Sequence, residues 1–134
     1  GEVQAAKWAQ AIANPPGRLD KLGVKAGMRA AILDLDDPHF AAELATRATV
    51  VDDLSGLDIL IYGADSAQAL ARIGDLVPAL ADRGALWIVS LKGRLLMVKD
   101  VEVMAAAKAV GLVDNKVCSF SADRTALRFT RRRV

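Results

Sequence analysis

Short apolar runs without periodicity, each closed by a polar segment, alternate along the chain with segments of helical spacing. Such runs indicate strands that are buried on both faces of a sheet. They predict four strands, at residues 28–33, 49–51, 57–62 and 85–91. Two more strands are expected over 115–120 and 125–130, and the four residues between them are typical of a hairpin turn.

An N-terminal helix is predicted over residues 2–13, because apolar residues recur there at helical spacing. Its apolar stripe consists of Ala5, Trp8, Ala9 and Ile12. Two prolines and a glycine directly afterwards end this helix, since proline lacks an amide proton and restricts the residue before it. An apolar stripe ahead of the first strand has to pack on its own domain or on a neighbouring chain.

Further helices are expected between the strands. They are predicted as one turn over 18–23, a helix over 38–46, a helix from Asp65 or Ser66 to a break at Gly74, a second from Asp75 to Gly84, and a last one from Asp100 to Val110. Asp75 and Asp100 are expected to be N-caps, and Gly84 and Gly111 are expected to follow the helix ends.

This alternation predicts an α/β domain of three layers, in which helices cover both faces of a mainly parallel Rossmann-like sheet that ends in an antiparallel hairpin. In the last strand Leu127 and Phe129 share one face, while Arg128 and Thr130 share the other, wetter face, as is typical near a sheet edge. The 134 residues fit one domain. Residues 1–17 are its N-terminal helix with the proline and glycine break, and residues 18–133 are its core.

Composition limits the classes of protein to consider. Hydrophobic residues make up 53% and charged residues 25%, a globular balance that excludes a disordered chain. The single cysteine, Cys118, excludes an intrachain disulfide, which fits a cytoplasmic location, and with one histidine no metal site is expected. No apolar run is long enough for a membrane helix and no secretory signal is expected, so no membrane partner is predicted.

Charge is divided unevenly along the chain. Residues 1–75 carry 7 Lys and Arg against 11 Asp and Glu, a net of −4, whereas residues 76–134 carry 11 against 5, a net of +6. The chain ends in a tail of three arginines, Arg131 to Arg133, which can attract phosphates or keep a fraying chain end soluble. Aromatic residues are only 4%, so stacking platforms are missing and no specific nucleic-acid partner is predicted.

Four segments carry a resemblance to a known family: residues 21–28 (KLGVKAGM), 84–87 (GALW), 111–118 (GLVDNKVC) and 127–129 (LRF). Over about residues 18–133 the chain resembles the bacterial family called domain of unknown function 3052, which has no established activity. The hairpin-ended sheet and residues 80–89 also resemble the S-adenosylmethionine-dependent methyltransferases. These resemblances imply a truncated methyltransferase-like fold and say almost nothing about chemistry.

One departure from the methyltransferase pattern concerns the cofactor. Those enzymes have an acidic residue and a glycine-rich turn after the first strand, where the backbone approaches the cofactor. Here residues 34–39 read Asp-Leu-Asp-Asp-Pro-His, without a glycine. Side chains would crowd the cofactor's path, and no cofactor is predicted. Asp52 and Asp53 follow the next strand, where a ribose-binding carboxylate would stand, although a carboxylate after a strand is common.

The candidate site lies beyond the carboxyl ends of the parallel strands, where ligands bind in open sheets. The candidate ligand-binding residues are Asp34, Asp36, Asp37, His39, Asp52, Ser90, Lys92 and Arg94, with Asp53 and Asp65 expected at the same edge. Lys92 and Arg94 can hold an anionic ligand, or they can belong to an exposed polar loop. The ligand stays open and no catalytic residue is assigned.

Three features of this set admit two interpretations each. The acidic residues of 34–37 can bind Mg²⁺, or they can solvate a strand end as residues that favour turns. His39 can be a general base oriented by a neighbouring aspartate, or a solvated residue at a helix start. Cys118 can be a nucleophile, but in an apolar strand it is expected to be a small hydrophobe with a raised pKa.

Residues 95–98 (LLMV) are apolar in what should be a surface connection. They either insert into the core or form an exposed patch, and a homodimer contact is favoured. We therefore predict a non-catalytic Rossmann-like domain that acts through oligomerisation or partner binding. The alternative is a small-molecule or nucleotide-binding protein or methyltransferase-like enzyme that uses the loops at the carboxyl ends of the strands.

Overall fold

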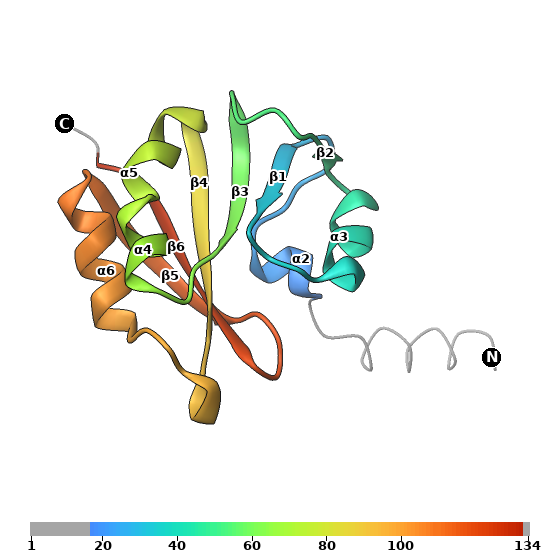
Figure 1. The fold of residues 1–134 in the computed structure, drawn as a ribbon. Helices are drawn as coiled ribbons and strands as arrows, with labels where there is room; N and C mark the ends of the chain where they lie inside the picture. Colours follow the sequence, from blue (N-terminus) through green and yellow to red (C-terminus); the bar gives the residue numbers. More distant parts are fainter. Residues whose placement is uncertain (1–16, 133–134) are drawn as a thin grey trace, which may run out of the picture.

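The computed structural model describes residues 17–132, which form a six-stranded sheet flanked by helices (Figure 1). The strands are β1 (Arg29–Leu33), β2 (Thr49–Val50), β3 (Leu57–Gly63), β4 (Leu80–Leu91), β5 (Leu112–Ser119) and β6 (Arg124–Arg131). Their order across the sheet is β2-β1-β3-β4-β6-β5. The predicted N-terminal helix and its apolar stripe lie outside the described residues.

β1 to β4 run parallel, and β6 runs antiparallel to both of its neighbours, β4 and β5. The predicted mainly parallel sheet with a C-terminal antiparallel hairpin is therefore confirmed. From β1 the chain passes to β2 on one side and then to β3 on the other. This reversal makes a switch point between β1 and β3, where doubly wound sheets leave a ligand crevice beyond the carboxyl ends of the strands.

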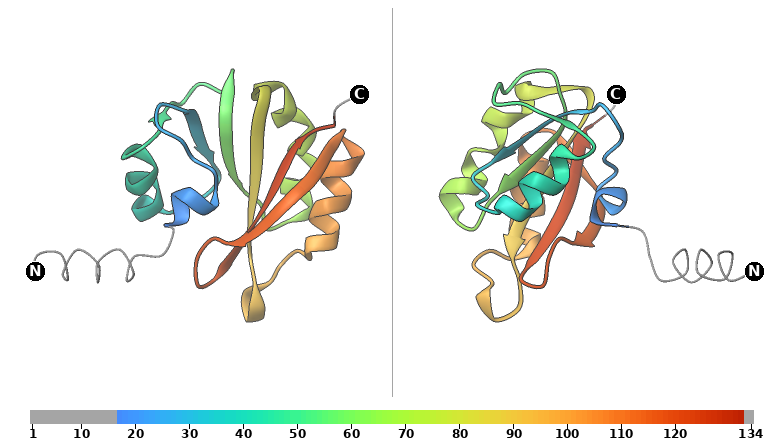
Figure 2. Two further views of the ribbon diagram at one scale, coloured as in Figure 1. Left: turned by 180° about the vertical axis from the view of Figure 1, so that it is seen from behind. Right: turned by 90° about the vertical axis from the view of Figure 1, so that its right-hand side faces the viewer.

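Helices cover both faces of the sheet (Figure 1 and Figure 2). The α-helices are α2 (Arg18–Lys21), α3 (Pro38–Ala45), α4 (Ala67–Ala71), α5 (Ile73–Leu76) and α6 (Asp100–Ala109), and the 3₁₀ turns are η1 (Val77–Ala79) and η2 (Gly93–Leu95). Side chains of α2 and α3 join one apolar core with Ile61 and Trp87. Those of α4, α5 and α6 join the other with Leu60 and Tyr62. Neighbouring strand residues point to opposite faces, so the three-layer prediction is confirmed.

Helix starts agree with the sequence in one case and differ in two. Ser66 is the N-cap of α4, as predicted. The predicted caps Asp75 and Asp100 are wrong, because both residues lie inside their helices. Arg72 and Lys99 hold the N-cap positions of α5 and α6 instead.

The predicted helix from 75 to Gly84 is wrong in its second half. The helical turns end at Ala79, and β4 begins at Leu80. Gly84 does not end a helix but lies within β4, where a Cβ would stand 2.3 Å from the Leu57 carbonyl oxygen. A glycine is needed because the backbones of β3 and β4 come close where their register shifts, between Leu57 and Ile59.

Two aromatic side chains in the core have their polar atoms satisfied within the fold. Trp87 in β4 is fully buried, and its Nε1 donates to the Leu22 carbonyl at 3.0 Å. The hydroxyl of buried Tyr62 donates to the Ala69 carbonyl at 2.8 Å. Burial, and to a lesser extent the charge of Asp34, raise the pKa of Tyr62. Both groups therefore form hydrogen bonds within the fold, Trp87 to the segment after α2 and Tyr62 to α4.

The segment 95–98 divides between surface and core. Val98 is buried, whereas Leu95, Leu96 and Met97 have exposed fractions of 51%, 44% and 67%. Val101, at the start of α6, is also exposed. These four exposed residues, Leu95, Leu96, Met97 and Val101, are called the 95–101 patch below.

Candidate functional site

The loop after β1, the first predicted ligand loop, closes the carboxyl end of β3 with its backbone. Asp34 adopts a left-handed conformation with φ 55°, which an aspartate tolerates better than most residues. A Cβ at Gly63, the last residue of β3, would lie 2.3 Å from the Asp34 carbonyl oxygen and 3.2 Å from the Leu35 Cα. The backbone of the loop therefore lies directly against the end of β3, and only a glycine fits at position 63.

The side chains of this loop either support the fold or face solvent. Asp37 Oδ1 accepts a hydrogen bond of 3.0 Å from an amide in the first turn of α3 and caps that helix. The Asp34 carboxylate lies 3.9 Å from the Arg72 guanidinium, and both are largely exposed. Asp36 and His39 are exposed. In the described part of the chain, no group of three His, Cys, Asp or Glu side chains is arranged to hold a metal.

The acidic pair after β2 lies away from that loop. β2 is two residues long, and the chain then returns to the start of β3. The Asp53 carboxylate pairs at 2.9 Å with Nη2 of Arg29, the first residue of β1. The pair therefore sits near the amino end of β1, and the structure does not bring Asp52 together with Asp34.

The remaining predicted residues gather where β3 and β4 end, mostly in contacts that support the fold. Asp65 Oδ1 accepts a hydrogen bond of 2.8 Å from the last amide of β4 and ties the two strand ends together. Ser90 is buried within β4. Lys92 Nζ donates to Ser119 Oγ at 2.8 Å and so contacts the β5–β6 hairpin. Arg94 is exposed in η2.

Cys118 is half-buried in β5, and burial raises the pKa of its thiol. At pH 7 the reactive thiolate is therefore scarcer than in a free cysteine, and it becomes abundant only as the pH rises through the raised pKa. We expect iodoacetamide to alkylate Cys118 more slowly than glutathione at pH 7. Because the chain has one cysteine, mass spectrometry of the intact protein measures the rate directly. A rate equal to that of glutathione would contradict this assignment.

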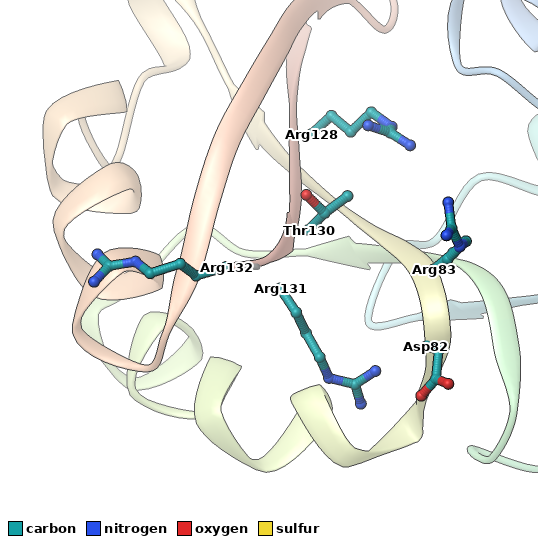
Figure 3. Close-up of a pocket in the computed structure, with 6 residues that line it drawn as sticks. All are labelled: Asp82, Arg83, Arg128, Thr130, Arg131 and Arg132. Atoms are coloured by element: carbon teal, nitrogen blue, oxygen red, sulfur yellow. The ribbon is translucent and has the colours of Figure 1, made fainter. Parts of the chain in front are cut away.

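A second polar site lies at the other end of the strands, where β4 begins and β6 ends (Figure 3). A cavity of about 640 Å³ opens there. It is lined by Asp82, Arg83, Arg128, Thr130, Arg131 and Arg132. Four guanidinium groups against one carboxylate give this space, called the arginine cavity below, an excess of positive charge.

Arg131 anchors the wall of the arginine cavity. Its Nη1 donates to the Ala81 carbonyl at 2.8 Å, and its Nη2 donates to the carbonyls of Val77 and Leu80 at 2.7 and 2.9 Å. These carbonyls belong to η1 and to the first residues of β4. Of the predicted basic tail, Arg131 is thus held by the fold and does not fray, while Arg133 lies outside the described residues.

Replacing Arg131 by methionine keeps the apolar stem and removes the three hydrogen bonds. We expect the Arg131→Met variant to lose about 1.5 kcal/mol of unfolding free energy, because partial exposure lets water replace part of each bond. Urea unfolding followed by circular dichroism measures the change. Arg132→Met, at the exposed neighbouring position, is the matched control and should change stability by less than about 0.5 kcal/mol. Equal losses in both variants would contradict the role of Arg131.

None of the six residues that line the arginine cavity was among the candidate site residues predicted from the sequence. The alternation of Arg128 and Thr130 with apolar residues in β6, together with the excess positive charge of residues 76–134, was the available signal. It did not identify Arg83, because the start of β4 was predicted as a helix.

No family model and no curated protein matches the chain. Solved structures that match it include a TehB-like SAM-dependent methyltransferase from Corynebacterium glutamicum, with 15% identity and a TM-score of 0.56 over 98% of this chain and 97% of that one. A SAM-dependent methyltransferase from Aquifex aeolicus has 11% identity and a TM-score of 0.64 over 89% and 95%. The N-methyltransferase NodS from Bradyrhizobium japonicum has 15% identity and a TM-score of 0.60 over 83% and 89%.

These similarities establish the fold class, as the sequence predicts. In the part of the chain that the structure describes, no helix is long and apolar enough to cross a membrane. S-adenosylmethionine, which this fold implies, needs a close approach of the backbone at the turn after β1, and the residues of this turn do not supply the glycines for it. The 34–37 loop has no glycine, and its Asp34 backbone lies against Gly63. The chain thus combines the fold of the SAM-dependent methyltransferases with a turn after β1 that lacks their glycine-rich pattern.

Proposed function

We propose that this domain does not transfer methyl groups and acts through protein contacts, as a homodimer or with a partner. The observation that carries the proposal is the approach of the Asp34 carbonyl to Gly63, which leaves no room for a Cβ at the last residue of β3 and sets the glycine-free 34–37 loop against that strand end. A cofactor would have to displace this loop, and with it the Asp37 cap of α3. The free-energy cost of that rearrangement would offset part of the cofactor's binding free energy and weaken its affinity.

The 95–101 patch supports a second copy of the chain as the partner. Its members are exposed and close in sequence, around η2 and the first turn of α6. This segment projects beyond the sheet in Figure 1, so a second copy of the chain can reach it. A patch on a two-fold axis contacts itself, so one exposed apolar segment is sufficient to build a dimer interface.

Isothermal titration calorimetry measures whether the chain binds S-adenosylmethionine or S-adenosylhomocysteine, which methyl transfer would require. We expect no saturable heat with either compound. Saturable binding together with methylation of any acceptor would overturn this part of the proposal.

Light scattering coupled to gel filtration tests the homodimer. A mass of twice the 14.2 kDa chain is expected for the wild type, and the monomer mass for Leu96→Glu. Leu54→Glu is the matched control, since Leu54 is a leucine of similar exposure, 39% against 44%, that lies outside the patch. A monomeric wild type, or equal effects of the two substitutions, would exclude this interface.

A second candidate function is binding of a small anionic molecule at the carboxyl edge. Arg94 is exposed and lies two residues after Lys92, so both cations are near the end of β4. The match to two methyltransferase structures, over most of this chain and of theirs, also favours this function. A thermal-shift screen with nucleotides and divalent metals distinguishes the two functions. A dose-dependent stabilisation that Arg94→Gln abolishes would favour the ligand-binding function.

Family membership and location are further proposals. The resemblance of residues 21–28 and 84–87 supports membership of the family called domain of unknown function 3052. The single cysteine, which excludes an intrachain disulfide, supports a cytoplasmic location.

A further inference from the structure

We propose that the arginine cavity binds the phosphate group of a small phosphorylated molecule, with Arg83, Arg128 and Thr130 as its binding residues. The cavity lies at the amino ends of the parallel strands, away from the switch point. The inference therefore goes beyond the proposed function and does not depend on whether the carboxyl edge binds a cofactor.

The positive charge of the arginine cavity is not compensated by ion pairs. Within residues 17–132 the salt bridges involve other arginines, namely Arg18, Arg29, Arg47 and Arg72. The carboxylate of Asp82 lines the cavity, but its side chain extends on the side where Arg131 lies, away from Arg83 and Arg128 (Figure 3). Two guanidinium groups that share one space without a counter-charge repel each other, and an anion between them relieves that repulsion.

A hydrogen-bonded chain of side chains orients two of the binding groups. Arg128 Nη1 donates to Asn115 Oδ1 at 2.8 Å, and Asn115 Nδ2 donates to Thr130 Oγ1 at 2.9 Å. Arginine can only donate, so the Asn115 oxygen faces Arg128 and its amino group faces Thr130. The Thr130 oxygen accepts from Asn115, which leaves its hydroxyl hydrogen free to donate. Arg128 likewise keeps further N–H donors for a ligand.

A β-bulge places Asn115 in this position. In the β5–β6 pair, Asp114 lies opposite Phe129 and Lys116 lies opposite Arg128, so Asn115 is an extra residue in β5. Bulges of this kind re-aim side chains and are frequent next to functional sites. The irregularity in β5 therefore has a consequence in the cavity, because it supplies the side chain that orients Arg128 and Thr130.

Arg83 completes the site from the neighbouring strand. Figure 3 shows the side chains of Arg83, in β4, and Arg128, in β6, extending into the same space. Arg131 points away toward η1, where its donors are engaged, and Arg132 points to the other side of the strand. The binding groups are thus two guanidinium forks and one hydroxyl, a donor set that matches the oxygens of a phosphate.

The size and lining of the cavity indicate a small ligand. Its volume of about 640 Å³ lies within the range of small-molecule sites. None of the six lining residues is aromatic, so recognition rests on the phosphate and not on stacking against a nucleic-acid base.

The test is calorimetric titration of the full chain with inorganic phosphate and with pyrophosphate at constant ionic strength. We expect saturable binding by the wild type, and dissociation constants that rise about tenfold or more in Arg83→Gln and Arg128→Gln. Asn115→Ala, which keeps both arginines, should also weaken binding because it releases Arg128 and Thr130. Circular dichroism of each variant establishes that it is folded.

Lys25→Gln is the matched control, because it removes one positive charge from an exposed side chain outside the cavity. Its affinity for pyrophosphate should equal that of the wild type. Absence of saturable binding, or equal weakening by Lys25→Gln, would overturn the proposal. Tighter binding of a single-stranded oligonucleotide than of pyrophosphate, lost in Arg128→Gln, would also overturn it and assign the site to nucleic acid.

Discussion

Replacing Trp87 by alanine is expected to lower the free energy of unfolding by about 4 kcal/mol, the largest effect of any single substitution considered. Trp87 is fully buried in β4, between β3 and β6, and belongs to the apolar core that α2 and α3 cover. The substitution leaves a cavity in the middle of the sheet and removes the donor to the Leu22 carbonyl. Urea unfolding followed by far-ultraviolet circular dichroism measures the loss.

Trp87→Phe separates the contribution of the buried ring volume from that of the hydrogen bond to the Leu22 carbonyl. Phenylalanine keeps most of the ring volume but cannot donate to the Leu22 carbonyl, so this variant should lose about 1–2 kcal/mol. The ranking of the two variants is therefore the decisive result. A loss below about 1 kcal/mol for Trp87→Ala would mean that the α2 segment does not pack on β4 as described.

The strands were predictable because their apolar runs have few competing interpretations. Residues 57–62 and 85–91 are apolar over a length that suits a strand buried on both faces, and both form β3 and β4 as expected. The start of β4 was missed, since residues 80–84 include an aspartate, an arginine and a glycine. Such residues are common at a helix end. Here Leu80 pairs with Leu57 of β3, and Gly84 is required by the Leu57 carbonyl, a contact distant in sequence.

The candidate site was predictable only where it depends on local sequence. The missing glycine in the 34–37 loop was readable from the sequence and predicted that side chains would crowd a cofactor there, whereas the backbone contact of this loop with Gly63 was not predicted. Asp52 was expected beside Asp34 because strands were assumed to end together, whereas the two-residue β2 ends near Arg29. The arginine cavity needed the register of β4, β5 and β6, including the bulge at Asn115, and no local pattern encodes that register.

Replacing Gly63 by alanine is expected to lower the free energy of unfolding by about 2–3 kcal/mol. The added methyl group would stand 2.3 Å from the Asp34 carbonyl oxygen, which is far inside van der Waals contact, and the neighbouring atom is backbone rather than a flexible side chain. Either the 34–37 loop moves or the end of β3 moves. Urea unfolding measures the loss, and amide hydrogen exchange in the first turn of α3 should accelerate, because the Asp37 cap moves with the loop.

Gly17→Ala is the matched control for Gly63→Ala. Gly17 is exposed, has an ordinary negative φ of −69° and has no atom within 4 Å of the position of a Cβ, so alanine there should change stability by less than about 0.5 kcal/mol. If Gly63→Ala were equally neutral, the Asp34 backbone could not be packed against β3 as described. The argument against S-adenosylmethionine that rests on this contact would then fail. A large loss at Gly63 alone would show that the contact between the Asp34 backbone and the end of β3 stabilises the fold, so that moving this loop for a cofactor would have an energetic cost.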